Sequence, residues 1–479
     1  MRDRHLPIRH SSPLSGSLAL LALALLLQGA AARAEAAVEI DDPAERVDKT
    51  VLANGLTVLT IEDRVTPVVS FQMWIHAGSS DESRFTGIAH LFEHMMFKGS
   101  ENVGPEEHAR LIEARGGRVN AFTSRDVTVY HSDVSPESLP LVIDLEAERL
   151  ANLDIGQRTL DSEREVVLEE RRLRTEDSPH GRAFEALAAV TWQAHPYRWP
   201  VIGWRSDVEQ VSVDACREFF ASYYVPSNVV LAIVGDFDTR TTLRHIKRAF
   251  GRLEGQRDIP RNLTREPEQR GERRATVHFE LRSPVLAAAW HAPATGHADG
   301  PALDAASQIL SAGRSSRLYR SLVYEQQVAL FAQGAYWELE EAGLFYAFVG
   351  VRPDADIDRA EQLFYGEIER MARDGVSPGE LEKAKRQLEV SLVNGLGTAH
   401  ALASRIGRDT VTFGRIRPLA ERLDAIAAVT REDVQRVVRS YLVAERRSAV
   451  QVIRRPESEP GSTEAAATTS DGSSGEGGQ

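Results

Sequence analysis

His90-Leu91-Phe92-Glu93-His94 is the stretch from which the fold and the chemistry of this chain can be argued. Apolar residues spaced i, i+3, i+4, i+7 and i+8 predict a helix with one face in a core: Ile88, Leu91, Phe92, Met95 and Met96. His90 and His94 then lie one turn apart beside that stripe, where two neutral imidazoles can bind one metal ion. Glu93 lies next to them and can act as a general base toward water, so the stretch has the H-x-x-E-H pattern of a zinc site. A polar helix face with two ordinary histidines is the alternative that this short pattern leaves open.

A catalytic zinc usually has three protein ligands, so a third ligand is expected elsewhere in the chain. Glu163 and Glu170 stand seven residues apart, and two helical turns place both on one face. Taken on their own, they are equally consistent with a solvated acidic surface, which is the commoner meaning of such residues.

Residues 1–34 have the pattern of a secretory signal peptide. Three arginines come first, at Arg2, Arg4 and Arg9. An unbroken apolar run from Leu18 to Leu27 follows, too short to span a bilayer, and Ala32-Arg33-Ala34 provides a small-x-small cleavage site. We therefore expect a periplasmic or secreted mature chain without a membrane span; an uncleaved anchor is the alternative.

Charge and cysteine content exclude some classes of function. The 479 residues carry a net charge of −13, and removal of residues 1–34, with four arginines and one aspartate, leaves −16. This charge disfavours nucleic acid and anionic membranes as partners. Cys216 is the only cysteine, so no intrachain disulfide can form and stability must come from core burial.

Strand and helix patterns occur in two blocks. In the first we expect strands on either side of Asn54-Gly55, at 68–76, at 120–134 (exposed) and at 229–236 (buried), with helices at 135–152 and 157–174. Residues 256–275 are charged, contain two prolines and lack apolar periodicity, which predicts an interdomain linker. Residues 457–479 are rich in Gly, Ser, Thr and acid and are expected to be disordered.

The second block, 276–456, echoes the first, 35–255. At a constant offset of 218, six residues line up with six others: Val211, Ser212, Asp214, Phe219, Ser222 and Tyr223 with Val429, Thr430, Glu432, Val437, Ser440 and Tyr441. The pattern predicts two tandem α+β domains, unless the likeness is coincidental. The metal motif has no second copy, because Asp304, Ser307 and Gln308 stand where His90, Glu93 and His94 would be.

Together these features resemble the pitrilysin/insulinase zinc peptidases, and specifically their mitochondrial-processing-peptidase-like branch. Glu170 stands 76 residues after His94, the spacing at which that family has a glutamate, and Glu163 matches another family glutamate. Residues 116–123, Gly-Gly-Arg-Val-Asn-Ala-Phe-Thr, match the family's G-G-x-x-N-A-x-T before an edge strand. Further similar segments are His195-Pro196-Tyr197, Tyr224-Val225-Pro226-Ser227-Asn228, Val234-Gly235-Asp236 and Gly313-Arg314-Ser315-Ser316-Arg317-Leu318, and the likeness runs from about residue 48 to 455.

The resemblance implies an α+β fold of two homologous domains, each a mixed or antiparallel sheet packed with helices, that enclose a peptide chamber. It implies one Zn²⁺ per chain, held by His90, His94 and Glu170, with Glu93 as general base and Glu163 as a carboxylate that orients the site. It also implies that extended peptides add as a strand to an edge that includes Asn120, Ala121, Phe122 and Thr123, although a plain edge strand is the alternative there.

One feature departs from the family. Active members often carry an arginine and a tyrosine, seven residues apart, in the second domain, where they bind substrate and stabilise the oxyanion. Val323 and Leu330 stand at those places, and a shift by one residue gives Tyr324 and Phe331, still without a cation. We therefore expect a similar partner subunit that supplies Arg and Tyr, or else a homodimer.

The function predicted from the sequence is that of an exported zinc endopeptidase or oligopeptidase acting on extended peptides. Two other classes compete with it. One is a non-catalytic scaffold or core subunit of the same family, and the other is a peptide-binding chaperone with a structural zinc. The complete set of His90, Glu93, His94 and Glu170 favours the enzyme.

Overall fold

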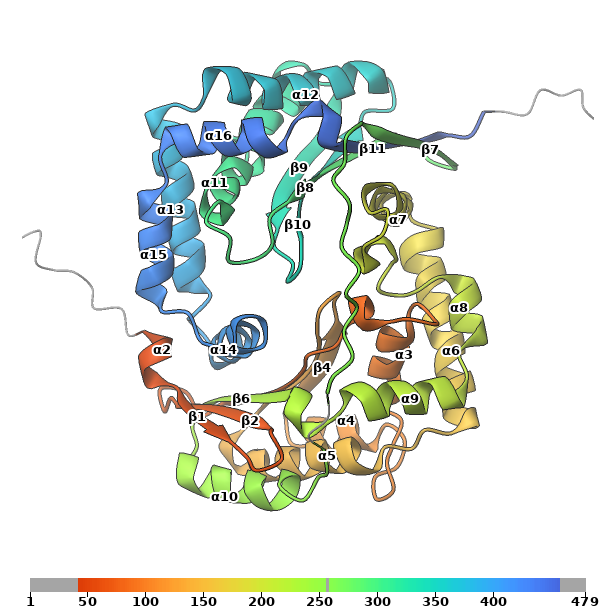
Figure 1. Ribbon diagram of the computed structural model, residues 1–479, viewed down its shortest axis with the longest axis vertical. Coiled ribbons are helices and arrows are strands. Elements are labelled where there is room, and N and C mark those ends of the chain that lie inside the picture. The colour runs from red at the N-terminus through yellow and green to blue at the C-terminus, as the bar shows by residue number, and fades with distance from the viewer. Residues whose placement is uncertain (1–41, 256–257, 457–479) are drawn as a thin grey trace, which may run out of the picture.

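The computed structural model describes residues 42–255 and 258–456 and consists of two halves, each built on one sheet (Figure 1). The expected signal peptide, 1–34, and the expected disordered tail, 457–479, lie outside the described residues.

The N-terminal half contains a six-stranded sheet in the order β1-β2-β6-β3-β5-β4, in which only the β2–β6 pair is parallel. Its strands are β1 (Asp48–Val51), β2 (Thr57–Glu62), β3 (Val69–Ile75), β4 (Arg118–Thr123), β5 (Thr128–Val134) and β6 (Val229–Gly235). Its helices are α2 (Pro43–Arg46), α3 (Ile88–Met95), α4 (Glu107–Glu113), α5 (Leu139–Asn152), α6 (Gln157–Arg171), α7 (Pro179–Thr191), α8 (Arg205–Gln210), α9 (Val213–Tyr223) and α10 (Thr239–Phe250), and a π-helical turn, η3 (Arg172–Glu176), follows α6.

The C-terminal half contains a five-stranded sheet in the order β7-β11-β8-β10-β9, with β7 and β11 parallel and the other neighbours antiparallel. Its strands are β7 (Arg273–Phe279), β8 (Val285–Ala292), β9 (Ala329–Trp337), β10 (Gly343–Val351) and β11 (Arg447–Arg454). Its helices are α11 (Gly300–Ser311), α12 (Ile357–Asp374), α13 (Pro378–Asn394), α14 (Ala399–Phe413), α15 (Leu419–Ala428) and α16 (Arg431–Tyr441), with a π-helical turn, η6 (Tyr319–Glu325), before β9.

The two halves repeat one topology, which confirms the predicted fold class. The helices α9 and α16 begin 218 residues apart, and so do the strands β6 and β11 that follow them. Each of these strands is the later member, in chain order, of the single parallel pair in its sheet. Its other neighbour, β3 for β6 and β8 for β11, is antiparallel to it. The limits 35–255 and 276–456 remain predictions.

The halves exchange one helix each. Helix α7 of the N-terminal half packs on the C-terminal sheet, where Ala183 and Leu187 share a core with Val285, Ala287 and Val450. Helix α14 of the C-terminal half packs on the N-terminal sheet in the same way, with Leu402, Ala403 and Ile406 against Leu59, Trp74 and Val129. Figure 1 shows α14 between the two sheets. Burial of these apolar faces stabilises the arrangement of the halves, because neither sheet has its full cover without the other half.

The segment expected as a linker, 256–275, was predicted too long. Its last three residues belong to β7, which pairs with β11. The described part before β7 runs along the molecule from one half to the other (Figure 1). Side-chain contacts hold it against the rest of the chain. Arg261 donates to the Asp81 carboxylate (2.9 Å), and Glu266 accepts hydrogen bonds from three successive backbone N–H groups at Gln193–His195. Two of the charged residues in the expected linker therefore make specific contacts.

The single exposed strand expected at 120–134 is also corrected. The chain forms a hairpin of β4 and β5, and only β4 is an edge strand, because β5 lies between β3 and β4. Residues of β5 are mostly buried. The turn at 124–127 has no glycine or proline, which is why the sequence did not show it.

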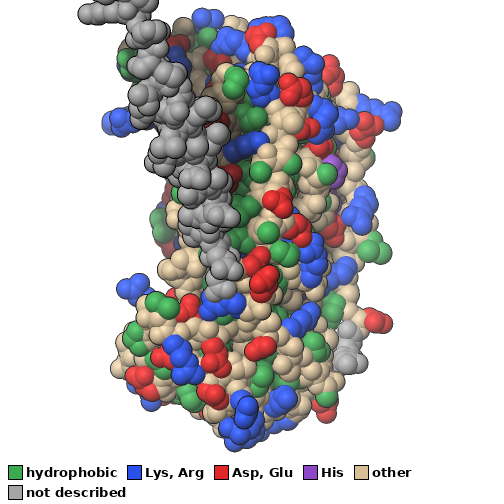
Figure 2. Space-filling model, turned by 90° about the vertical axis from the view of Figure 1, so that its left-hand side faces the viewer, with side chains coloured by type: hydrophobic (Ala, Val, Ile, Leu, Met, Phe, Trp, Pro, Cys, Tyr) green, Lys and Arg blue, Asp and Glu red, His purple; other side chains and the backbone are tan. Residues whose placement is uncertain are grey.

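The surface carries both signs of charge. Figure 2 shows acidic and basic side chains interspersed over the face that lies at the left of Figure 1. Within residues 42–255 and 258–456, none of the helices has the length and apolar composition that a bilayer crossing requires.

The packing of α14 gives a test of the helix exchange. A Cβ atom on Gly407 would lie 2.3 Å from Nε1 of Trp74 in β3, so Gly407→Ala should force α14 away from the sheet and destabilise the protein by about 1–3 kcal/mol. Thermal unfolding followed by circular dichroism should show a melting temperature several degrees lower. Gly366→Ala is the matched control: that mid-helix position in α12 has nothing within 4 Å of the added Cβ, and the change should be neutral or slightly stabilising. Equal effects of the two variants would contradict the packing argument.

Candidate active site

Helix α3 is held at its start by a buried carboxylate. Its N-cap, Gly87, has a positive φ of 85° and no side chain to cap the helix. Glu82, which is 1% exposed, accepts hydrogen bonds from the backbone N–H groups of Gly87 (2.9 Å) and Ala89 (3.0 Å) and replaces that cap. Gly203 lies so close that a Cβ on it would be 2.5 Å from the Cα of Gly87. Both glycines are therefore required where these two backbone segments meet.

The predicted apolar face of α3 is buried. Leu91, Phe92 and Met95 are fully inaccessible, and the Phe92 ring packs on those of Phe220 and Tyr224, with centroids 5.5 and 4.9 Å apart. Helix α3 ends at Met95. This packing fixes the rotation of the helix, so its polar face is presented toward α6.

The three predicted metal ligands converge between α3 and α6. Nε2 of His90 lies 3.7 Å, and Nε2 of His94 3.4 Å, from Oε2 of Glu170. The rings of His90 and His94 are 4.9 Å apart between centroids, and one donor atom from each of the three residues lies within 4.8 Å of the others.

The donor set fits a zinc ion. Ligand atoms about 2.0–2.2 Å from zinc at tetrahedral angles lie ~3.4 Å from one another, close to the separations found here. Oε2 of Glu170 is buried and accepts no hydrogen bond from the described residues, although it lies between the two imidazoles. A buried carboxylate oxygen without a hydrogen bond is costly unless a cation is bound to it. His90, His94 and Glu170 would hold the metal, which leaves a fourth position open.

Glu93 lies beside this cluster and is held by the edge strand. Thr123 at the end of β4 donates a hydrogen bond to Oε2 of Glu93 (2.5 Å). Burial raises the pKa of Glu93, which makes its carboxylate a stronger base, while the Thr123 bond opposes the shift. Thr123, predicted as a substrate contact, therefore positions Glu93.

Charged neighbours surround the ligands. Glu163, 2% exposed at its side chain, lies 3.6 Å from Nδ1 of His94 and 3.1 Å from Nζ of Lys98. Arg174 makes an ion pair with the other oxygen of Glu170 (2.6 Å). Sequence reasoning did not single out Thr123 as the partner of Glu93, nor Lys98 and Arg174. Arg174, four residues after Glu170, carried a usable signal, because i, i+4 pairs share a helix face.

The protonation of the two histidines differs. Burial, together with the charge of His94, lowers the pKa of His90, which favours its neutral, metal-binding form. Burial also acts to lower the pKa of His94, but the adjacent carboxylates of Glu163 and Glu170 outweigh it and raise that pKa to about 9. Metal binding at this site must therefore displace a proton.

Arg171 connects the elements that carry the ligands. This buried residue at the end of α6 makes an ion pair with Glu185 of α7 (2.8 Å) and donates to the backbone oxygen of Gly203 (2.7 Å). Gly203 is the residue that touches Gly87 at the start of α3. The positions of α3 and α6 are thus linked through one guanidinium group.

The predicted substrate residues lie on the open edge of the sheet. Strand β4 pairs only with β5, and exposure alternates along it. Asn120 and Phe122 are exposed on the face opposite to Thr123, and the Ala121 backbone N–H donates to the Asn120 side-chain oxygen (2.9 Å). The structure thus places the four residues on an edge next to Glu93, and their contact with peptide remains a prediction.

The positions expected to hold an arginine and a tyrosine offer no substitute for them. Val323 packs partly buried on the C-terminal core, whereas Tyr324 and Leu330 are 73% and 53% exposed. Phe331 on β9 stacks on His180 of α7, with centroids 5.6 Å apart. A mostly apolar cleft of about 490 Å³ lies between α7 and β10, and Arg174, His180, Phe184 and Phe348 are among its lining residues.

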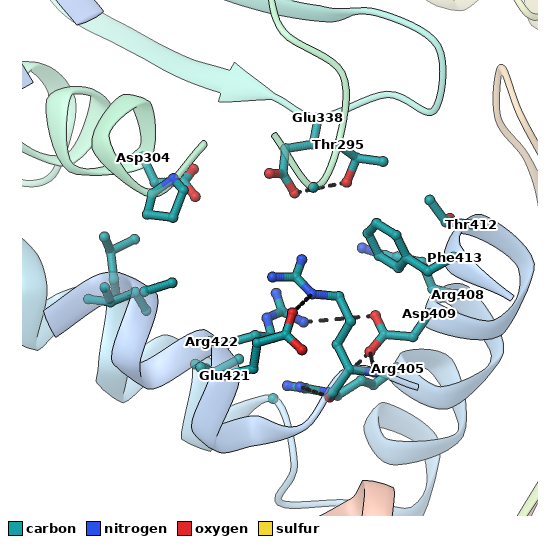
Figure 3. A pocket seen from close by; sticks show the side chains of 18 of the residues that line it. Thr295, Asp304, Glu338, Arg405, Arg408, Asp409, Thr412, Phe413, Glu421 and Arg422 are labelled. Carbon is teal, nitrogen blue, oxygen red and sulfur yellow. Dashed lines mark hydrogen bonds and ion pairs between the residues drawn. The ribbon is translucent and has the colours of Figure 1, made fainter. Parts of the chain in front are cut away.

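In the described part of the second half, the residues at the corresponding positions do not form an equivalent metal site. Asp304 of α11, the counterpart of His90, lines a cleft of about 620 Å³ together with residues of α14 and α15 (Figure 3). Burial, and then the charge of Glu338, raises the pKa of Asp304 to about 7. Among the described residues, two groups have the donors for a metal ion, and neither includes Asp304.

Comparison with known proteins gives the class. The model described as Insulinase (Peptidase family M16) matches residues 57–204, and that described as Peptidase M16 inactive domain matches residues 210–388. The chain belongs to the M16 peptidase family, which confirms the predicted pitrilysin/insulinase resemblance.

Particular relatives agree with this assignment. The zinc protease PqqE of Helicobacter pylori is 28% identical over 399 residues, which cover 82% of this chain and 90% of that protein. A probable mitochondrial-processing peptidase subunit beta of Arabidopsis thaliana is 27% identical and covers 82% and 76% of the two chains. The crystal structure of a protease from Helicobacter pylori superposes with a TM-score of 0.82 at 27% identity over 85% of this chain and 99% of that one.

The two glutamates of α6 are predicted to have different roles. Glu170→Gln should remove a ligand and greatly lower zinc occupancy, whereas Glu163→Gln should retain the ion and lower affinity or turnover by about 10–100-fold. Zinc content after dialysis measures this directly. Glu169→Gln is the control, because that side chain is 56% exposed and pairs with Arg172 at the surface. Loss of zinc from Glu163→Gln with zinc retained in Glu170→Gln would reverse the ligand assignment.

Proposed function

We propose that this protein is an exported, zinc-dependent endopeptidase or oligopeptidase that hydrolyses extended peptides. The observation that carries the proposal is the convergence of Nε2 of His90, Nε2 of His94 and Oε2 of Glu170, with Glu93 beside them and a free sheet edge next to Glu93. The naming of homologous proteins as zinc proteases supports it.

In the proposed peptide hydrolysis, the metal ion and the residues of the chain have separate roles. A zinc ion held by the three ligands would supply a Lewis acid for water and for the peptide carbonyl. Glu93 takes a proton from the attacking water and passes it to the leaving amine. Thr123 fixes one oxygen of Glu93, so the other oxygen is the one that handles the proton. Glu163 orients His94 from the side away from the metal.

The edge strand would bind the substrate through its backbone. A peptide added to β4 forms main-chain hydrogen bonds irrespective of its sequence, which suits broad specificity. A peptide that pairs at Ala121 has to replace the bond that its N–H makes with Asn120. The cleft lined by Phe184 and Phe348 is the nearby place for an apolar side chain, because Arg174, which pairs with Glu170, is one of its lining residues.

Two rival functions make different demands on the site. A scaffold subunit of the same family needs neither metal nor base, so the ordered contact between Thr123 and Glu93 argues against it. The match of residues 210–388 to a model described as inactive concerns a segment that contains none of His90, Glu93, His94 and Glu170, so it does not bear on the proposed active site. A chaperone with structural zinc would be expected to close the fourth coordination position, which three protein ligands leave open.

Export rests on the sequence of residues 1–34, with its basic start, apolar run and cleavage site. We propose a periplasmic or secreted location for the mature chain. N-terminal sequencing of the protein recovered from the producing cells tests this proposal.

The role of Glu93 gives the direct test of the enzyme. Glu93→Gln should keep zinc, because all three ligands remain, and should lower hydrolysis of a quenched fluorescent peptide by about 10²–10⁴-fold. Zinc content and melting temperature, both close to those of the wild type, are the controls. Wild-type turnover in Glu93→Gln would remove this residue from the mechanism.

We further propose that a second subunit completes the active site. Zinc and base are present, but Val323 is packed in a core and Leu330 is apolar, so no cation or phenol stands where one is expected for the oxyanion. The partner would have the same fold, lack H-x-x-E-H and contribute an arginine and a tyrosine, and the two chains would enclose a peptide chamber. A homodimer is the alternative.

The purified chain alone should bind zinc and cleave peptides weakly, and addition of such a partner should raise turnover. Size-exclusion chromatography with light scattering determines whether a mixed complex forms. Full activity of a monomer or homodimer, unchanged by any partner, would show that another group of this chain, such as Tyr324 or Arg174, completes the site.

A further inference from the structure

Three further metal-binding side chains meet where the two halves of the molecule join. His131 and Asp133 are two residues apart on β5 and project from the same face of the sheet. His400 lies in the first turn of α14, the helix that the C-terminal half contributes to this sheet. The His400 Nδ1 atom is 3.0 Å from Oδ2 of Asp133, and the rings of His131 and His400 meet edge-on with centroids 4.8 Å apart.

This cluster repeats the composition and spacing of the first site. Each consists of two imidazoles and one carboxylate whose donor atoms lie within 4.8 Å of one another. The ring centroids are 4.8 Å apart here and 4.9 Å apart for His90 and His94, and both ring pairs are steeply inclined, at 79° and 64°. The spacing that suits zinc between α3 and α6 is therefore present a second time.

The backbone around the cluster is fixed by buried polar contacts. Gln72 of β3, 1% exposed, donates to the backbone oxygen of His400 (3.0 Å) and to Oγ of Ser404 (3.0 Å). Ser70, also on β3, lies opposite Asp133 in the sheet and hydrogen-bonds its carboxylate. The side chains of His400 and Asp133 are 40% and 29% exposed, so an ion has access from solvent.

We propose that His131, Asp133 and His400 form a second transition-metal site, of the kind that takes zinc, which fastens α14 to the N-terminal sheet. Imidazole and carboxylate together suit Zn²⁺, and three protein donors leave one position for water. Because β5 and α14 belong to different halves, the bound ion would cross-link the halves directly.

The competing interpretation is a simple ion pair between His400 and Asp133 with His131 beside it. Zinc stoichiometry separates the two. After equilibrium dialysis against Zn²⁺, the full chain should hold two ions, and His131→Gln or His400→Gln should hold one. His90→Gln/His94→Gln should also hold one, and the variant with all four substitutions none. A wild-type content of one ion, or two ions retained in both His131→Gln and His400→Gln, would overturn the proposal.

His245→Gln is the matched control. Its imidazole also contacts an aspartate, Asp144, at 2.6 Å, but neither residue belongs to a group with the donors for a metal ion. This variant should keep two ions. If this variant lost one zinc ion as the other variants do, substitution of any such histidine would lower the zinc content, and the proposed location would be wrong.

A second measurement does not depend on the peptidase site. In the His90→Gln/His94→Gln background, Zn²⁺ should raise the melting temperature by several degrees, because an ion bound to the folded chain alone stabilises it. Co²⁺ in the same background should give visible absorption bands of a four-coordinate site. Adding His400→Gln should abolish both effects; a melting temperature that Zn²⁺ shifts equally with and without His400 would refute the site.

Discussion

The buried guanidinium of Arg171 is the contact on which the geometry of the metal site depends. It joins α6 to α7 through Glu185, and it donates to the backbone oxygen of Gly203, whose loop packs against Gly87 at the start of α3. An ion pair this deeply buried adds little net stability compared with apolar packing, but removal of one partner costs about 3–5 kcal/mol, because the other charge is left uncompensated. Arg171 thus holds two ligand-bearing helices in one relative position, so that Glu170 lies opposite His90 and His94.

This connection also makes the site depend on both halves. Helix α7 begins soon after Arg174 and buries Ala183 and Leu187 in the core of the C-terminal sheet. The segment that supplies Glu163 and Glu170 is therefore anchored at its far end in the other half of the molecule. A change that loosens the packing of α7 would move the third ligand, although no residue of the C-terminal half is itself a ligand of this site.

The features that could be predicted from the sequence are those that depend on local periodicity or on a fixed spacing between residues. The apolar stripe of α3, the seven-residue spacing of Glu163 and Glu170 and the 218-residue offset each correspond to an element of the structure. The sequence could not predict the hairpin in 120–134, because the turn at 124–127 has no glycine or proline, the strongest local markers of a turn. It could not predict the exchange of α7 and α14 either, since an amphipathic pattern shows that a helix has an apolar face but not which sheet covers it.

The burial of Arg171 could not be predicted for a related reason. It stands in the charged run Glu169-Glu170-Arg171-Arg172, where nothing local distinguishes a buried guanidinium from an exposed one. Arg171 is 3% exposed, whereas the side chain of Arg172 is 46% exposed, so the two neighbours have opposite environments. Contacts with Glu185 and with Gly203, which lie further along the chain, decide between them.

The hairpin of β4 and β5 relates the two donor clusters to each other. Side chains alternate along a strand, so Thr123 and Tyr130 face α3, while Phe122, Asn120 and His131 face the opposite side. One face of the hairpin therefore positions the base Glu93, and the other carries the residues against which α14 packs. The strand order places β5 inside the sheet and β4 at its edge, so a continuous backbone ladder connects the strand that α14 covers to the edge strand. Fastening α14 would in this way stiffen the edge on which a peptide is proposed to lie.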